Sequence, residues 1–296
     1  AKVENSVVEI VTEQVTTNSF FGQYVTQGAG SGVIISEDGN IITCAHVIDG
    51  ASTITVKTAD GTSYTAKLIG SDSQTDIAVI KIDASGLQPA VIGDSSKLVV
   101  GEQAIAVGNP LGELGGTVTS GIISALERQV NIDGTTYTLL QTSAAINPGN
   151  SGGALFNSAG ELVGIVNAKE SGSSIEGLGF AIPINSAMGI AENLLTNGYV
   201  SGRPQLGVVL SVINSSTSLN NITDYGVYFI KYADGVTGDL QFGDRIVAMD
   251  NVSVSSRADI MTLLAEHEVG DTVTLTVSRI EDTRVGRAAM TEIEVT

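Results

Sequence analysis

The chain has 296 residues, 42% of them hydrophobic, and this supply of apolar side chains excludes a mostly disordered protein. Its 32 acidic residues against 14 Lys and Arg give a net charge of −18 at pH 7. Such a surface repels phosphate backbones and anionic membranes, so we expect no nucleic-acid partner. The length allows two ordinary domains or one large one.

Cysteine usage and the first residues bear on the cellular setting. Cys44 is the only cysteine, so no intrachain disulfide can form. This is typical of a reducing compartment, or of a bacterial exterior protein that does without bridges. No stretch approaches the ~20 apolar residues of a membrane span, and residues 1–25 are not a secretory signal. Because the chain begins at Ala1, we expect a processed or trimmed form, whose missing leader would be a signal or an anchor.

Residues 28–183 read as short strands separated by glycine-rich turns. Apolar runs on both sides of Asp38-Gly39 and of Asp60-Gly61 predict two hairpins. Further alternating segments continue to residue 183, and this regular spacing indicates barrels or sandwiches rather than βαβ units. The pattern pauses at Leu87–Val91, where we expect a division into two barrel-like halves.

A helix is predicted over residues 185–197, with Asn185 or Ser186 as its cap and Gly198 as its stop. Residues 201–205 read as a linker. Residues 205–296 predict a small β-rich module with one helix over 255–268. We therefore place the domains at 1–199 and 200–296.

The segment "AAINPGNSGGALFN", residues 144–157, is the most specific motif. Glycines on both sides of Ser151 allow a tight turn that few side chains would fit. Such a turn can aim the amides of Gly149 and Ser151 at one point and so stabilise an oxyanion. The alternative is an ordinary Gly-Ser turn between strands.

A serine nucleophile needs a base and an orienting group. The chain has two histidines: His46 ends an apolar strand, and His267 follows a helix, where a solvated helix end is the simpler interpretation. Asp76 enters an apolar strand, where a carboxylate is costly unless it is paired. Each residue alone has a structural alternative: a hydrogen-bonded core histidine, or an aspartate in a strand-end turn.

Together, His46, Asp76 and Ser151 with "AHV", "DIAVIKI" and "GNSGG" resemble the chymotrypsin-fold serine proteases, most closely the bacterial HtrA (Deg) branch. Further matching segments are "GSGVIIS" (30–36), "GNPLG" (108–112), "VTSGIISALER" (118–128) and "GLGFAIP" (177–183). The second module resembles a PDZ domain through "QLGVVL" (205–210), "GDRIVAMDN" (243–251) and "GDTVTLTVSR" (270–279).

The resemblance implies a mainly β fold: a two-barrel chymotrypsin-like protease domain followed by a small PDZ-like α+β domain. It implies a serine endopeptidase of protein quality control that cleaves unfolded or misfolded proteins. Ser151 is then the nucleophile, His46 the general base and Asp76 its orienting group. Gly149, Asn150 and Ser151 form the oxyanion hole. Digestive proteases have Asp at the position of Asn150, so we expect conformational switching rather than activation by prodomain cleavage.

The resemblance also bears on specificity. Trypsin-like enzymes carry Asp six residues before the nucleophile, where this chain has Ala145, followed by Ile146. We therefore expect an uncharged pocket and cleavage after Val, Ala or Ile. Residues 167–177 form the opposite wall, beginning with Asn167 and Ala168, and Lys169 and Glu170 would lie at its rim.

Several positions depart from the family pattern. Ser143 stands where relatives commonly have Asp, and Cys44 where they have Asn; a small buried residue is the simpler reading of Cys44. In the PDZ-like part, Leu206, Gly207 and Val208 form the expected carboxylate-binding loop for peptide C-termini. An ordinary edge strand is the alternative there. The usual small-residue turn of that module reads Gly238-Asp239-Leu240.

Partners and location follow from the resemblance too. Family members trimerise through an N-terminal aromatic segment, so we expect a homotrimer through Phe20, Phe21 and Tyr24; a loop that covers the cleft is the alternative. We expect a bacterial, extracytoplasmic protein of the cell envelope or periplasm. Two isolated histidines and one cysteine predict no metal site, and no cofactor is indicated. A non-catalytic chaperone or peptide-binding scaffold remains the alternative function.

Overall fold

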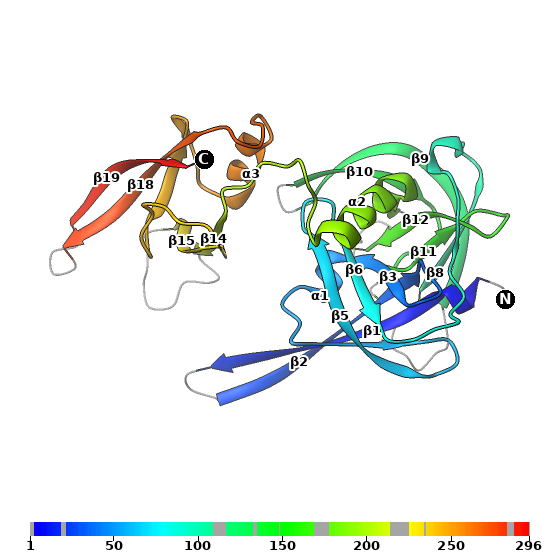
Figure 1. The fold of residues 1–296 in the computed structure, drawn as a ribbon. Coiled ribbons are helices and arrows are strands. Elements are labelled where there is room, and N and C mark those ends of the chain that lie inside the picture. Colours follow the sequence, from blue (N-terminus) through cyan, green and yellow to red (C-terminus); the bar gives the residue numbers. More distant parts are fainter. Residues whose placement is uncertain are drawn as a thin grey trace. The chain divides into compact units, whose positions relative to one another are not determined.

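A computed structural model describes residues 3–18, 22–108, 117–132, 135–147, 149–168, 178–213, 225–233, 235–282 and 287–295. The chain folds as two compact units, Ala1–Ser201 and Gly202–Thr296. Each unit is built mainly from antiparallel strands around its own hydrophobic core (Figure 1). Within these ranges no helix has both the length and the apolar character needed to cross a membrane.

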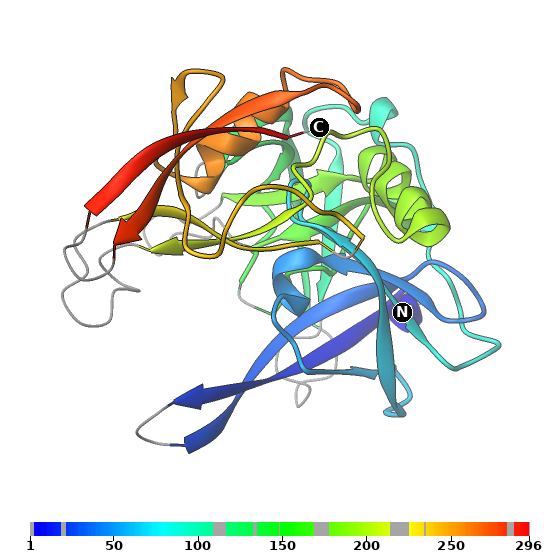
Figure 2. The ribbon, with the colours of Figure 1, turned by 60° about the vertical axis from the view of Figure 1, so that its left-hand side comes forward.

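The first half of the larger unit is a closed barrel with the strand order β1-β2-β3-β6-β5-β4. Both predicted hairpins are confirmed, since β2 pairs with β3 and β4 with β5, each antiparallel. Gly39 and Gly61 have positive φ at these turns, a conformation that side chains disfavour. The elements are η1 Glu4–Ser6, β1 Val7–Asn18, β2 Gly22–Ile34, β3 Asn40–Cys44, α1 Ala45–Ile48, β4 Thr53–Lys57, β5 Ser63–Asp72 and β6 Ile77–Ile82. The β1–β2 pair extends beyond the barrel as a long ribbon (Figures 1 and 2).

The second half closes into a ring because β11 pairs with both β8 and β12. Its elements are β7 Val91–Ile92, η2 Ser95–Lys97, β8 Gln103–Gly108, β9 Thr117–Ile132, β10 Thr135–Thr142, β11 Ala154–Phe156, β12 Glu161–Asn167 and β13 Gly179–Pro183. The predicted division near Leu87–Val91 falls at the junction of the two halves, where β6 ends at Ile82 and β7 begins at Val91.

Helix α2 (Ile184–Asn197) follows β13 and packs against β5, β6 and β12. The predicted stop is confirmed: Gly198 is left-handed, and its N–H donates to the Leu194 carbonyl. The predicted cap is wrong, because Pro183 occupies the N-cap and no side chain caps the helix. The helix begins directly after the strand, so Asn185 lies in its first turn and its side chain binds Asp94 and Ser95 instead.

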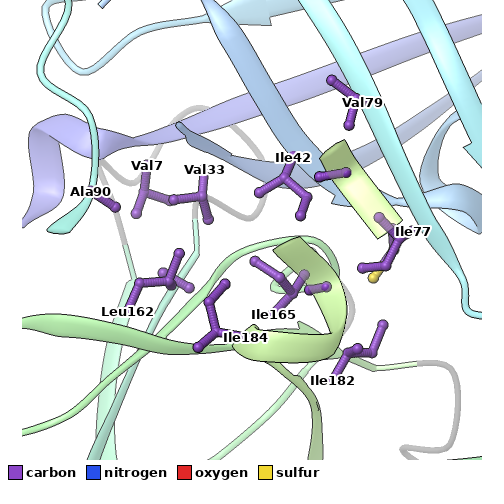
Figure 3. Close-up of a cluster of buried hydrophobic side chains, with 14 of the residues drawn as sticks. Val7, Val33, Ile42, Ile77, Val79, Ala90, Leu162, Ile165, Ile182 and Ile184 are labelled. Carbon is purple, nitrogen blue, oxygen red and sulfur yellow. The ribbon is translucent and has the colours of Figure 1, made fainter. Parts of the chain in front are cut away.

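Apolar side chains from both barrels and from α2 form one continuous core between the two halves (Figure 3). Val33, Ile42 and Ile77 of the first barrel face Leu162 and Ile165 of the second. All five are fully buried. Burial of each such side chain contributes about 1.5–3 kcal/mol, so this contact holds the two barrels in a fixed arrangement.

The smaller unit is a sheet of strand order β14-β15-β16-β18-β19, with β17 paired to β16. Its elements are β14 Val208–Ile213, β15 Gly226–Tyr232, β16 Arg245–Met249, β17 Val252–Ser253, α3 Arg257–Leu264, β18 Val273–Asp282 and β19 Arg287–Val295. Ser256 and Asp259 form a capping box at the start of α3. The helix is shorter than predicted, since the N–H groups of Glu266 and His267 donate three residues back, to Leu263 and Leu264, as in a tighter turn.

Candidate active site

Three side chains that are far apart in the sequence meet at the junction of the barrels. His46 lies in α1, directly after β3, and Asp76 directly precedes β6. Because β3 pairs with β6 so that Cys44 faces Ile77, the residues next to this pair are also neighbours, and the Ala45 N–H donates to the Asp76 carbonyl at 3.0 Å. Ser151 comes from the second barrel, in the turn before β11.

The three side chains form a continuous chain of hydrogen bonds. His46 Nδ1 lies 2.6 Å from Asp76 Oδ2, and His46 Nε2 lies 3.0 Å from Ser151 Oγ. An ionised carboxylate only accepts, so Nδ1–H donates to Asp76, and Nε2 is left to accept the Ser151 hydroxyl. The structure thus brings together the three residues that the sequence singled out, with Asp76 3% and Ser151 7% exposed.

Asp76 is held in an unusual backbone conformation, with φ of 59°. For a residue other than glycine, this region is sparsely populated and must be imposed by the surroundings. The carboxylate accepts from the His46 N–H at 2.9 Å, from the His46 ring, and from Asn167 Nδ2 at 2.9 Å. These donors replace the water that the buried carboxylate has lost.

The four residues expected to form a specificity pocket have different surroundings. Asn167 is 1% exposed, and its amide binds Asp76, a contact that the sequence analysis missed. Its only sequence signal is a polar residue at the end of an apolar strand. The Ala168 N–H donates to Ser151 Oγ at 3.2 Å.

The other two residues expected in the pocket differ in exposure. Ala145 is exposed, whereas Ile146 is buried against Gly179. Lys169 and Glu170 lie outside the described residues.

A tight turn over residues 147–150 presents two backbone amides beside Ser151. The Asn150 N–H donates to the Asn147 carbonyl at 3.0 Å, and Gly149 has φ of 99°. Positive φ at the third position of a turn favours glycine there. Among the hydrogen bonds of the described residues, none uses the N–H of Gly149 or of Ser151. These two N–H groups are therefore the candidate donors to an incoming oxygen atom.

The glycines after Ser151 are required by close packing. Gly152 has φ of 79°, and a Cβ there would lie 2.2 Å from both the Ser31 carbonyl oxygen and Thr43 Oγ1. A Cβ on Gly153 would lie 2.5 Å from the Val107 carbonyl oxygen. Since real Cβ atoms do not approach so closely, any side chain at either position would displace the Ser151 backbone.

Asn150 is 1% exposed, and neither its Oδ1 nor its Nδ2 has a hydrogen-bond partner within the described ranges. Its side chain lies close to Gly108, where an added Cβ would be 2.5 Å from Oδ1. The side chain is neutral, so it does not form the ion pair that an aspartate at this position would make. A buried, unpaired carboxamide is destabilising, which is unusual outside functional sites.

A cavity of about 310 Å³ opens beside the Ser151 hydroxyl. Its walls are largely backbone and small side chains: Gly28, Ala29, His46, Val47, Gly149, Ser151 and Ala168. A substrate carbonyl placed in this cavity would lie near the serine, the imidazole and the two amides of the turn. The arrangement therefore suits nucleophilic attack on a carbonyl carbon.

The sequence predicted that Cys44 and the two histidines are isolated from one another, and for Cys44 and His46 this is wrong. Ligand atoms of Cys44, His46 and Asp76 lie within 4.8 Å of one another, because the β3–β6 register brings the strand ends together. These atoms are already hydrogen-bonded within the protein: Cys44 Sγ lies 3.4 Å from the Val166 carbonyl oxygen, and Asp76 accepts the donors described above. His46 and Asp76 therefore belong to the hydrogen-bond chain of the site, whereas Cys44 bonds to a backbone carbonyl beside it.

His267 belongs to the smaller unit and is less solvated than expected. Its Nε2 lies 3.1 Å from Asp250 Oδ2 and its Nδ1 3.8 Å from Asp271 Oδ2, with 26% of the side chain exposed. It links the β16–β17 turn to the segment after α3. These contacts give His267 a structural role within that unit.

In the smaller unit, β14 lies at one end of the sheet and pairs with β15 alone among the described strands. Leu206 is buried, Gly207 has φ of 64°, and Val208 begins β14. The Gly207 carbonyl accepts from Ala233 N–H at 2.8 Å. This loop therefore precedes an edge strand that can accept a further strand.

Comparison with known proteins identifies both units. Residues 30–165 match the family described as trypsin-like peptidase domain, and residues 204–290 match the PDZ domain family. Over 284 residues the chain is 40% identical to "Serine protease Do-like HtrA" of Lactobacillus helveticus, covering 89% of this chain and 68% of that protein. It is 39% identical to "Serine protease Do-like HtrB" of Bacillus subtilis, covering 98% and 69%.

The chain belongs to the HtrA family of serine proteases. A further member, "Probable periplasmic serine endoprotease DegP-like" of Pseudomonas savastanoi, is 43% identical over 87% of this chain and 54% of its own length. The chain spans about two thirds of the length of the two Do-like relatives and about half of the DegP-like one.

Solved HtrA structures share the fold. "HtrA-type protease AlgW with decapeptide" superposes with a TM-score of 0.61 and 32% identity, covering 99% of this chain and 95% of that one. "HtrA-type protease AlgW with tripeptide" gives 0.60 and 34%, covering 99% and 93%. The predicted family, the class of serine endopeptidases and the fold class, two β barrels followed by a PDZ domain, are thereby confirmed.

Proposed function

We propose that this HtrA chain is an endopeptidase that cleaves unfolded or misfolded proteins, with a protease domain over residues 1–199 and a PDZ-like domain over 200–296. The observation that carries the proposal is the unbroken hydrogen-bond chain from Asp76 through His46 to Ser151. Family membership supplies the reaction class, and the geometry supplies the residues for it.

In the first step, His46 Nε2 takes the Ser151 hydroxyl proton while Oγ bonds to the scissile carbonyl carbon. The carbonyl π electrons move onto the oxygen atom, and the N–H groups of Gly149 and Ser151 donate hydrogen bonds to the oxyanion that forms. Asp76 keeps the Nδ1–H tautomer and stabilises the imidazolium. His46 then gives the proton to the leaving amine as the C–N bond breaks, and water repeats the sequence on the acyl-enzyme.

Replacing Ser151 tests the nucleophile. We expect Ser151→Ala to lower the hydrolysis of unfolded casein by about 10⁶, because no other group forms the acyl-enzyme. Ser143→Ala is the matched control: this serine is exposed and lies outside the hydrogen-bond chain, so the rate should stay close to wild type. An unchanged rate in Ser151→Ala would refute Ser151 as the nucleophile, whereas suppression of client aggregation that does not depend on Ser151, without hydrolysis, would favour a non-catalytic chaperone or scaffold.

We propose that the residue before the scissile bond is a small aliphatic one such as Val, Ala or Ile. The support is the uncharged Ala145, six residues before Ser151, and the apolar Ile146 beside it. In peptides that differ only at this position, the Val peptide should have at least about tenfold higher kcat/KM than the Arg peptide, since one pocket contact is worth about 1–3 kcal/mol. A preference for Arg or Lys would refute this assignment.

We further propose that the smaller unit binds peptide C-termini and so regulates the protease. The open edge of β14 allows strand addition, and the loop Leu206–Gly207–Val208 precedes it with backbone amides for a carboxylate. The relatives AlgW were solved with bound peptides, which supports a peptide ligand.

A decapeptide with an apolar C-terminal residue should raise the casein hydrolysis rate, and its C-terminal amide should not. Gly207→Ala should weaken this response, since the backbone of residue 207 has positive φ and an added Cβ would lie 3.0 Å from a Val236 methyl group. Gly243→Ala is the control, with positive φ and no atom near the added Cβ. Equal responses of the wild type to both peptides would contradict the regulatory role.

We also propose a homotrimer that works outside the cytoplasm of a bacterium. The proposal of a trimer is based on the aromatic residues Phe20, Phe21 and Tyr24, whose side chains lie outside the described part. The proposal for the location is based on the relative named as probably periplasmic. Light scattering should give the mass of three 30.4 kDa chains. A monomeric mass would reject the trimer, and cell fractionation tests the location.

A further inference from the structure

Ser31 makes contacts that reach across the two barrels to the Ser151 turn. It lies in β2, is fully buried, and is 118 residues away from Gly149 in the sequence. Its hydroxyl donates to the Gly149 carbonyl at 2.7 Å, and its N–H donates to the Ser151 carbonyl at 2.8 Å. Ser31 therefore anchors the backbone on both sides of Asn150.

The two anchored carbonyls bracket one donor of the oxyanion hole, the Ser151 N–H, and the first of them belongs to the residue that carries the other donor, Gly149. The Gly149 carbonyl belongs to the peptide plane before Asn150, and the Ser151 carbonyl to the plane before Gly152. The Ser151 N–H lies in the plane between them, so neither neighbour can rotate without breaking a bond to Ser31. Because Gly149 has no Cβ, its φ and ψ angles are restricted less than those of other residues. The Ser31 hydroxyl supplies the restraint that Gly149 lacks.

Ser31 is itself fixed from the other side. Thr43, also fully buried, donates its hydroxyl to the Ser31 carbonyl at 2.7 Å. Gly152 packs against both groups with no room for a side chain. The backbone that carries the Ser31 hydroxyl is therefore held by β3, and a positioning group needs such a fixed base if it is to hold a turn in place.

We propose that Ser31 is a positioning residue that keeps the Gly149 and Ser151 amides aimed at the oxyanion. This inference rests on the proposed function and adds a residue that touches no substrate. It acts on the transition state, where the negative charge develops, and not on substrate binding. The expected signature is a lowered kcat with an unchanged KM.

The test compares Ser31→Ala with Ser6→Ala in the full chain. Ser6 is a matched control, since it is 2% exposed and donates to the Val3 carbonyl at 2.7 Å, away from the site. Ser31→Ala should lower kcat by about 10², the effect of a misplaced oxyanion donor, with KM within about twofold of wild type. Ser6→Ala should keep kcat.

A second readout separates positioning from a loss of packing. A peptide trifluoromethyl ketone forms an oxyanion when Ser151 adds to it, so Ser31→Ala should weaken its inhibition by the same factor as kcat/KM. Peptide binding to the Ser151→Ala protein, which forms no oxyanion, should not change when Ser31→Ala is added. Ser31→Cys keeps the side-chain shape with a weaker donor, so its kcat and its inhibition by the ketone should lie between those of the wild type and Ser31→Ala.

The outcomes are distinguishable. An active wild type whose kcat and ketone affinity survive Ser31→Ala overturns the role of Ser31 alone, as does a kcat loss no greater than that of Ser6→Ala. If Ser31→Ala does not fold, Ser31→Cys decides by the same criteria. A wild type that neither hydrolyses casein nor adds the ketone overturns the proposed function itself.

Discussion

The burial of one carboxylate is the constraint on which the site depends. Asp76 is 3% exposed, so its charge is tolerable only with hydrogen-bond donors in place of water. His46 provides two of them, from its backbone and its ring, and Asn167 provides the third. The same bonds that stabilise Asp76 fix the tautomer of His46 and direct Nε2 at Ser151. Stability and chemistry are thus coupled in one network.

These donors come from both barrels, so the network needs the barrels to keep a fixed arrangement. His46 and Asp76 belong to the first barrel, and Asn167 and Ser151 to the second. The apolar contact that includes Ile42, Ile77 and Ile165 provides that arrangement close to the site. The bonds from Ser31 to the Ser151 turn cross the same junction. The site is therefore a property of the junction rather than of either barrel.

Local patterns predicted most of the fold, because hairpins at Asp-Gly pairs and a glycine stop at Gly198 depend on neighbouring residues. The motif around Ser151 was predictable for the same reason, since Gly149 and Gly152 adopt conformations that glycine favours. The contacts of Asn167 and Ser31 with the site were not predictable from spacing. Their partners lie 91 and 118 residues away, and only the register of distant strands brings them into contact. The cap of α2 was mispredicted because the helix begins directly after β13.

A fluorophosphonate probe reacts with a serine that a neighbouring base has activated, so its labelling shows whether Ser151 is an activated nucleophile. We expect one label per chain, located at Ser151 by peptide mass spectrometry, and a labelling rate lower by a factor of about 10³ or more in His46→Ala and Asp76→Asn. Labelling at another residue, or equal labelling rates in these variants, would contradict this expectation.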